Sequence, residues 1–172
     1  MSGLRVIARA ILFIMVVSGQ PKPATPKTLN PPMDEKLVLQ AHATGDQIYV
    51  CKVDPNNEFV WTLQAPEATL FDSDDKPVGR HFAGPTWQWS DGSAVKAKLT
   101  ASSPSPESDS IPWLLLTAID HKGSGAMRSV ASIQRLHTIG GKAPASGCDA
   151  AHGGSTTRSH YAADYYFYAR SK

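Results

Sequence analysis

The side chains best suited to chemistry gather in one short segment, GRHFAGPTWQWSDGSAV, which spans residues 79–95. It contains His81, and an imidazole acts as a general base when a carboxylate fixes its tautomer. The possible carboxylate partners are Glu67, Asp91 and Asp164. A pair between His81 and Glu67 or Asp91 predicts a hydrolase or lyase. The structural alternative is that a single histidine in a β-protein only packs and donates hydrogen bonds.

Two tryptophans in the same segment favour ligand binding as a second kind of chemistry. Trp87 and Trp89 are two residues apart, so on a strand they project from the same face. An indole ring offers a flat apolar surface with one N–H donor at its edge. The structural alternative is that both rings pack in the core. The predicted ligand-binding patch consists of Trp87, His81, Trp113 and Arg135.

Arg135 lies in the segment SIQRLHT, where a period of two places it on the same strand face as His137. A buried arginine needs a carboxylate partner. Glu67, in the segment APEA, is the candidate for that partner. The sequence therefore predicts a structural ion pair between Arg135 and Glu67.

Cofactor and metal signatures are sparse. The six histidines and two cysteines show none of the close ligand spacings typical of zinc sites. A histidine-based metal-binding module assembled in space is a third hypothesis, with no metal ligand assigned. The sequence contains no P-loop, no G-x-G-x-x-G fingerprint and no G-x-S-x-G elbow. We predict no cofactor.

The two cysteines, Cys51 and Cys148, are most simply one disulfide if the protein enters an oxidising compartment. Such a bond would close a loop of close to a hundred residues and would contribute about 4 to 5 kcal/mol. The alternative is two reactive thiols. It is weaker because the chain has no C-x-x-C motif and no base lies beside either cysteine in sequence.

Residues 1–20 have the order of a secretory signal: Arg5 and Arg9 precede an apolar run over residues 10–17, and small and polar residues follow. We expect export to the periplasm or beyond, with cleavage left open and an uncleaved anchor as the alternative. Two of the 17 basic residues lie in this segment, which leaves 15 basic and 15 acidic residues in the rest. That balance argues against a nucleic-acid partner. We expect membrane contact only through the N-terminal segment.

The remaining chain reads as a proline-rich linker over residues 21–36 and a single domain over 37–172. Within the domain, short segments alternate apolar and polar residues with a period of two, and turn residues separate them. Val95, Ala97 and Leu99 are expected to face inward, and the apolar segment 112–119 is expected to be buried on both faces. This pattern predicts an all-β fold, an antiparallel β-sandwich or small β-barrel. The expected strands cover 47–53, 58–65, 93–101, 112–119, 129–138 and 159–169.

Several motifs occur together in a recognisable order: APEATLFD, VGRHFAGPTWQWSDGS, IPWLLL, SIQRLHTIGGKAPASGCDAAH and YAADYYFY. In this respect the chain resembles a bacterial and fungal family, domain of unknown function 3455, from Gly45 to Tyr168. The resemblance implies an exported protein with cysteines in Y-x-C and S-G-C-D positions, here Cys51 and Cys148, which supports the disulfide. It implies no activity. The second tryptophan of TWQW is less typical of relatives, which places weight on Trp87.

The sequence thus predicts an exported all-β domain with a non-catalytic role, as a ligand-binding or structural module outside the cytoplasm. The expected partner is a small molecule or a component of the cell envelope. The alternatives are the His81-based hydrolase or lyase and the histidine-based metal-binding module.

Overall fold

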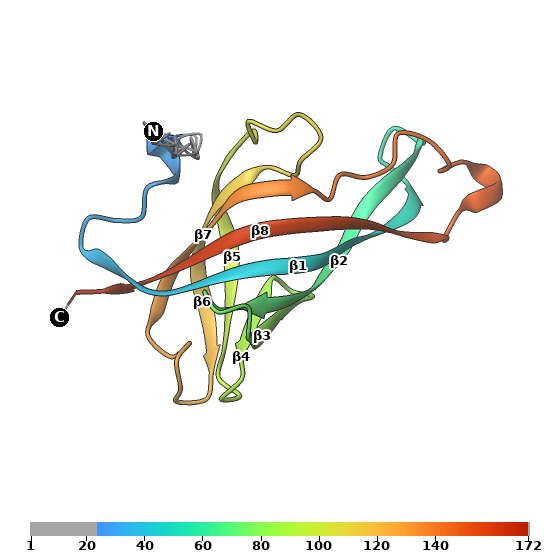
Figure 1. The fold of residues 1–172 in the computed structure, drawn as a ribbon. Coiled ribbons are helices and arrows are strands. Elements are labelled where there is room, and N and C mark those ends of the chain that lie inside the picture. The colour runs from blue at the N-terminus through green and yellow to red at the C-terminus, as the bar shows by residue number, and fades with distance from the viewer. Residues whose placement is uncertain (1–23, 172) are drawn as a thin grey trace, which may run out of the picture.

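The computed structural model describes residues 24–171, and in this part of the chain eight antiparallel strands close into a barrel (Figure 1). Each strand pairs with the next in sequence, and the last strand pairs with the first. The result confirms the predicted all-β domain and identifies the barrel as its architecture. The strands are β1 Glu35–Val53, β2 Phe59–Phe71, β3 Pro77–Phe82, β4 Thr86–Trp89, β5 Ala94–Ser103, β6 Trp113–Lys122, β7 Val130–Gly140 and β8 Thr156–Arg170; the short 3-10 helices are η1 Lys27–Leu29 and η2 Ala150–His152.

Alternation along each strand fills the barrel. From Tyr161 to Ala169 of β8 every second side chain is buried and the residues between are more exposed, as the period of two predicts. The inward side chains of β8 pack against those of the other strands and form one core cluster. Its largest fully buried members are Trp87, Tyr161, Tyr165, Phe167, Leu70 and Met127.

A second, smaller apolar cluster lies on the outside of the barrel. In the segment 112–119, Trp113 and Leu115 face outward and are buried because Leu29 of η1 packs on them. Gln134 fixes this cover, since its Nε2 donates a hydrogen bond of 2.6 Å to the carbonyl oxygen of Leu29. Burial on both faces is therefore confirmed for the first half of the segment only, and Ile119 near its end is exposed.

The fold begins earlier than the expected domain boundary at residue 37. Both η1 and the start of β1 lie within the segment expected to be a linker, 21–36. Leu29 explains the difference, because one apolar side chain among prolines and lysines is enough to dock the segment on the outer cluster. The predicted signal over residues 1–20 lies outside the described residues. No helix among the described residues is long and apolar enough to cross a membrane.

The Asp91–Gly92 turn connects β4 and β5, as the sequence predicts. Gly92 has a φ of +83°, a conformation that is unfavourable for residues with a side chain. The carboxylate of Asp91 accepts hydrogen bonds from the Ser93 N–H at 2.9 Å and from the Ser93 hydroxyl at 2.6 Å. Its second oxygen accepts the Ala126 N–H at 2.7 Å, which ties this hairpin to the loop between β6 and β7.

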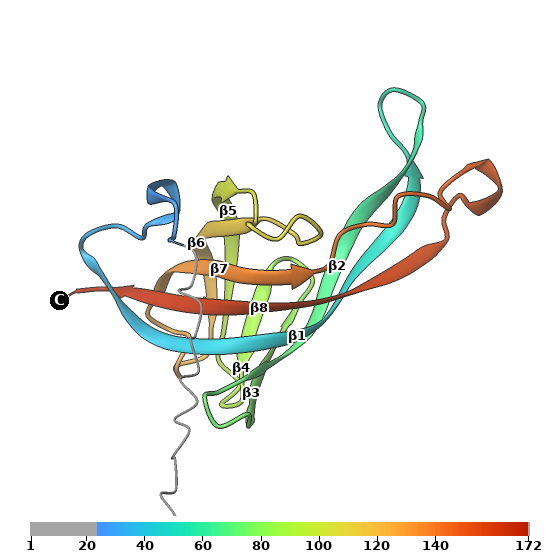
Figure 2. The same cartoon turned by 45° about the horizontal axis from the view of Figure 1, so that its top comes forward.

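At one end, β1, β2 and β8 continue beyond the barrel as an arm (Figure 2). Cys51, near the end of β1, is joined there to Cys148 by a disulfide, which confirms that prediction and excludes two free thiols. The disulfide attaches the segment before η2 to the arm. Trp61 adds a second tie, because its indole N–H donates a hydrogen bond of 2.9 Å to the carbonyl oxygen of Ser146.

Candidate functional site

A cavity of about 170 Å³ lies inside the barrel and is lined by side chains from all eight strands. We call it the inner cavity. Its lining is largely apolar, and the exceptions are Gln47, His81, Arg135 and Tyr165. Leu63 and Leu99 belong to the lining but are 52% and 58% exposed, so they mark the mouth where the cavity meets the surface. Leu99 therefore faces the cavity, as expected, without being buried.

Arg135 is the charged group of the inner cavity. Its side chain is buried, and its Nε and Nη2 both donate to the carbonyl oxygen of Pro112, at 3.2 and 2.9 Å. Within residues 24–171, no Asp or Glu side chain lies within ion-pair distance of the guanidinium. A buried cation without a counter-charge is unfavourable, so this part of the barrel is electrostatically suited to an anion.

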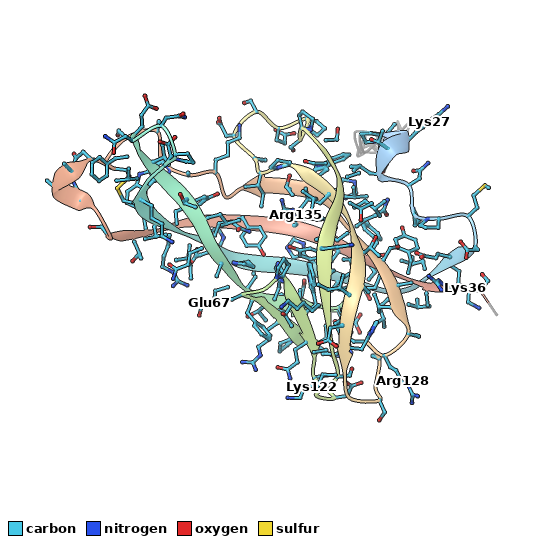
Figure 3. All side chains as sticks on the ribbon, turned by 180° about the vertical axis from the view of Figure 1, so that it is seen from behind. Lys27, Lys36, Glu67, Lys122, Arg128 and Arg135 are labelled. Carbon is cyan, nitrogen blue, oxygen red and sulfur yellow. A yellow bond between two sulfur atoms is a disulfide. The ribbon has the colours of Figure 1, made fainter. Side chains whose placement is uncertain are left out.

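The predicted ion pair between Arg135 and Glu67 is wrong. Glu67 accepts a hydrogen bond of 2.7 Å from Arg158, on the outer face of the barrel. The reason is strand alternation: Pro66 lines the inner cavity, so the next residue must point outward. Figure 3 shows Arg135 within the ring of strands and Glu67 at its margin.

Unpaired polar atoms concentrate at the inner cavity. Among the described residues, five buried side-chain nitrogen or oxygen atoms lack a hydrogen bond of normal geometry. Three belong to residues that line the cavity: Nε2 of Gln47, Nε1 of Trp87 and the hydroxyl of Tyr165. The Tyr165 hydroxyl interacts with Arg135 and Tyr161, but outside normal hydrogen-bond geometry. Buried polar groups in native proteins are nearly always satisfied. The inner cavity is thus bordered by polar groups that have no protein hydrogen-bond partner of normal geometry.

His81 forms part of the cavity wall. Its ring stacks on Trp87, with ring centres 4.1 Å apart and an angle of 10° between the planes. Its Nδ1 is 2.9 Å from the carbonyl oxygen of Thr86, to which it donates. Burial lowers the pKa of His81 to about 3, and the charge of Arg135 also lowers it, against the opposing effect of the Thr86 hydrogen bond. At physiological pH the His81 ring is therefore neutral, and it lines the cavity as an aromatic side chain.

The depressed pKa of His81 makes stability dependent on acid. The pKa of about 3 in the folded protein lies below the ordinary histidine pKa of 6.5, so the stabilisation is complete above pH 6.5 and is lost as the pH falls toward 3. Between pH 7 and pH 5 this residue should remove about 2 kcal/mol from the free energy of unfolding. His81→Phe keeps a ring against Trp87 but cannot titrate. We expect its free energy of unfolding to fall by about 2 kcal/mol less than that of the parent between pH 7 and pH 5. Urea unfolding at both pH values measures the difference, and equal losses in parent and variant would show that His81 is not buried in its neutral form.

The three candidate catalytic residues are not joined. Asp91 is occupied in its turn, and the hydrogen bonds from Ser93 and Ala126 lower its pKa. Glu67 and His81 both line a shallow hollow of about 540 Å³ on the outside, but no hydrogen bond connects them. His81 has its hydrogen bond to a backbone carbonyl rather than to any carboxylate of the described chain. The geometry of a histidine base oriented by an acid is therefore not formed at His81.

The predicted ligand-binding patch comes together in part. Trp87, His81 and Arg135 all line the inner cavity. Trp113 does not, because it faces outward into the cluster around Leu29. Sequence position alone could not show this, since the inward phase of β6 falls on Leu114 and Leu116.

Sequence reasoning missed Gln47 as a lining residue. It is a polar residue at an inward position of β1, and it pairs across the ladder with Pro66 of β2. Its only sequence signal is a polar side chain in the apolar phase of a strand. Tyr165 lies in the segment YAADYYFYA, whose aromatic residues suit either a cavity lining or an ordinary core strand, and the structure places Tyr165 in the lining. Within residues 24–171, no three His, Cys, Asp or Glu side chains are grouped so that they could hold a metal ion.

Comparison with known proteins gives one match. The sequence model of the family described as Protein of unknown function (DUF3455) matches residues 31–169. No curated protein and no solved structure matches the chain. The matched range begins just before β1 and ends within β8, so it covers the barrel, the arm and every residue of the inner cavity.

Proposed function

The chain belongs to this family of unknown function, and we propose that it is a non-catalytic binding module whose inner cavity holds a small organic anion with an apolar body. The observation that carries the proposal is Arg135, a buried guanidinium with no carboxylate partner in the described chain. Two of its N–H groups face a backbone carbonyl, which carries no net charge. A ligand carboxylate would supply the counter-charge and accept the remaining N–H donors.

The dimensions and lining of the inner cavity support the choice of ligand class. A cavity of about 150 Å³ with apolar walls holds a molecule the size of benzene, and this one is about 170 Å³. The apolar lining suits a single ring or a short branched chain. Leu63 and Leu99 at the mouth would contact the apolar body of the ligand.

The protonation states of the cavity support binding without catalysis. His81 is neutral and is not oriented by an acid. Burial raises the pKa of Tyr165 and of Tyr161, so both phenols stay protonated at physiological pH. Neutral phenol and indole groups donate hydrogen bonds to an anion, whereas no group of the cavity is prepared to take a proton from a substrate.

Export forms part of the proposal. The Cys51–Cys148 disulfide is typical of oxidising compartments. The charge and hydropathy order of residues 1–20 has the pattern of a secretory signal. The module would therefore meet its ligand outside the cytoplasm.

Benzoate and benzyl alcohol test the proposal as matched probes, because they share a ring and differ in charge. In ¹⁵N-labelled protein at pH 7, we expect benzoate to shift the indole N–H signal of Trp87, assigned from its loss in Trp87→Phe. We expect benzoate to bind at least tenfold more tightly than benzyl alcohol, since a charge-assisted hydrogen bond contributes about 1.5 to 3 kcal/mol. Equal affinities for the two probes, or no shift at Trp87 with either benzoate or hexanoate, would contradict anion binding in the inner cavity.

A further inference from the structure

A second hollow lies on the outside of the barrel and shares no lining residue with the inner cavity. We call it the outer pocket. It has a volume of about 230 Å³ and lies between the loop that follows β5 and the outer faces of β6, β7 and β8. Pro106, Trp113 and Ile139 give it a mainly apolar lining. Its polar groups include His137 and Asp164.

The backbone of β7 places His137 in this pocket by an irregular conformation. The pairing of β7 with β8 shifts register between Leu136 and Ile139, and His137 within that shift has a φ of +50°. The left-handed region is unfavourable for a residue with a Cβ atom. Because of this irregularity, the prediction that Arg135 and His137 share a strand face is wrong. Arg135 points into the inner cavity, whereas His137 lies with Trp113 on the outside. Irregularities of this kind re-aim side chains near sites.

Hydrogen bonding determines what His137 offers to the pocket. Its Nδ1 lies 2.8 Å from Oδ2 of Asp164, whose other oxygen is 3.2 Å from Nδ1 of His42. A carboxylate only accepts hydrogen bonds, so Nδ1 of His137 is the donor and Nε2 of the neutral ring carries a lone pair. No hydrogen bond from the described residues engages that Nε2. In its neutral form His137 is thus an oriented acceptor.

Trp113 supplies the complementary donor. Its side chain is 2% exposed, and its indole N–H has no hydrogen-bond partner in the described chain. The rings of Trp113 and His137 stand edge to face, with their centres 5.4 Å apart. The outer pocket is therefore lined by two neighbouring rings, one with an unpaired acceptor and one with an unpaired donor.

From this arrangement we propose that the outer pocket is a second binding site, for a neutral molecule that carries a hydroxyl group on an apolar body. A hydroxyl is the group that both donates and accepts, so it can donate to Nε2 of His137 and accept from Nε1 of Trp113. A carboxylate cannot donate, and the side-chain carboxylates of Glu107 and Asp164 in the pocket lining disfavour a second anion there. The outer pocket thus selects a phenol or alcohol, whereas the inner cavity selects an anion, and neither proposal depends on the other.

Phenol and anisole are the probes, since anisole keeps the oxygen and lacks the O–H donor. We expect phenol, titrated at pH 8 into ¹⁵N-labelled full-length protein, to move the indole N–H signal of Trp113 downfield and to leave that of Trp87 in place. Trp113→Phe assigns the signal. Anisole should bind at least about fivefold more weakly than phenol, because one net hydrogen bond is lost.

Two variants separate the pocket from the general effect of a lost histidine. His137→Asn shortens the side chain, and asparagine tolerates a positive φ, so the strand should keep its fold. We expect it to weaken phenol binding about fivefold. His42→Asn removes the other imidazole on Asp164, which lies outside the outer pocket, and should leave phenol affinity unchanged. The proposal is overturned if phenol shifts only Trp87, if anisole binds as tightly as phenol, or if the two variants behave alike.

Discussion

Replacing Arg135 by methionine should weaken benzoate binding by about 30-fold or more and change the stability of the barrel little. Removing one partner of a buried, hydrogen-bonded charge pair costs about 2 to 5 kcal/mol of affinity, which is at least about 30-fold in Kd. Stability responds differently because the ligand-free protein holds Arg135 without a counter-charge. The variant no longer buries that charge, and methionine has a similar length. These gains oppose the loss of the two hydrogen bonds to Pro112.

The matched control is Glu67→Gln, which removes one charge from the residue expected to pair with Arg135. Glu67 is exposed and contacts Arg158 rather than the cavity, so benzoate affinity should stay within about twofold of the parent. Arg135→Lys keeps the charge but loses the planar fork of donors, and its affinity should fall between those of the parent and Arg135→Met. Calorimetric titration with benzoate and urea unfolding of each variant give the two readouts. If Arg135→Met binds benzoate like the parent, the guanidinium does not hold the anion.

The sequence predicted the inward faces well where the strands are regular. The buried set of β8 is the set that the period of two selects, and three of the four predicted ligand residues meet in one cavity. This part of the prediction succeeds because side-chain alternation in a regular strand depends only on residues that are adjacent in sequence. It also predicted the Asp91–Gly92 turn, because that conformation depends on two residues alone.

Features that depend on partners distant in sequence, or on one inserted residue, could not be predicted. Alternation was applied to Arg135 and His137 together, but the register shift in β7 separates them onto opposite faces. Glu67 was paired with the wrong arginine, because the sequence does not show that β8 brings Arg158 beside it. The sequence predicts a linker around Leu29, because the outer cluster that buries this residue forms only when β6 and β7 are side by side.

The largest expected effect on stability comes from the disulfide. The double variant Cys51→Ser, Cys148→Ser should lose about 4 to 5 kcal/mol in the free energy of unfolding, because the cross-link spans 97 residues and restricts the unfolded chain. The transition in urea should move to lower concentration. The parent treated with reductant is the control, since it lacks the bond and keeps the native side chains. The reduced parent should unfold at the same urea concentration as the double variant and at a clearly lower concentration than the oxidised parent.

The position of the disulfide separates its structural role from ligand binding. It ties the arm, whereas Arg135 and the unpaired polar groups line the barrel interior, and neither cysteine lines the inner cavity. In the absence of urea the double variant should therefore bind benzoate within about twofold of the parent despite its lower stability. Coincident unfolding of the oxidised parent and the variant would show that the arm opens independently of the barrel. A parallel loss of benzoate affinity would instead show that the arm shapes the inner cavity through the continuous strands β1, β2 and β8.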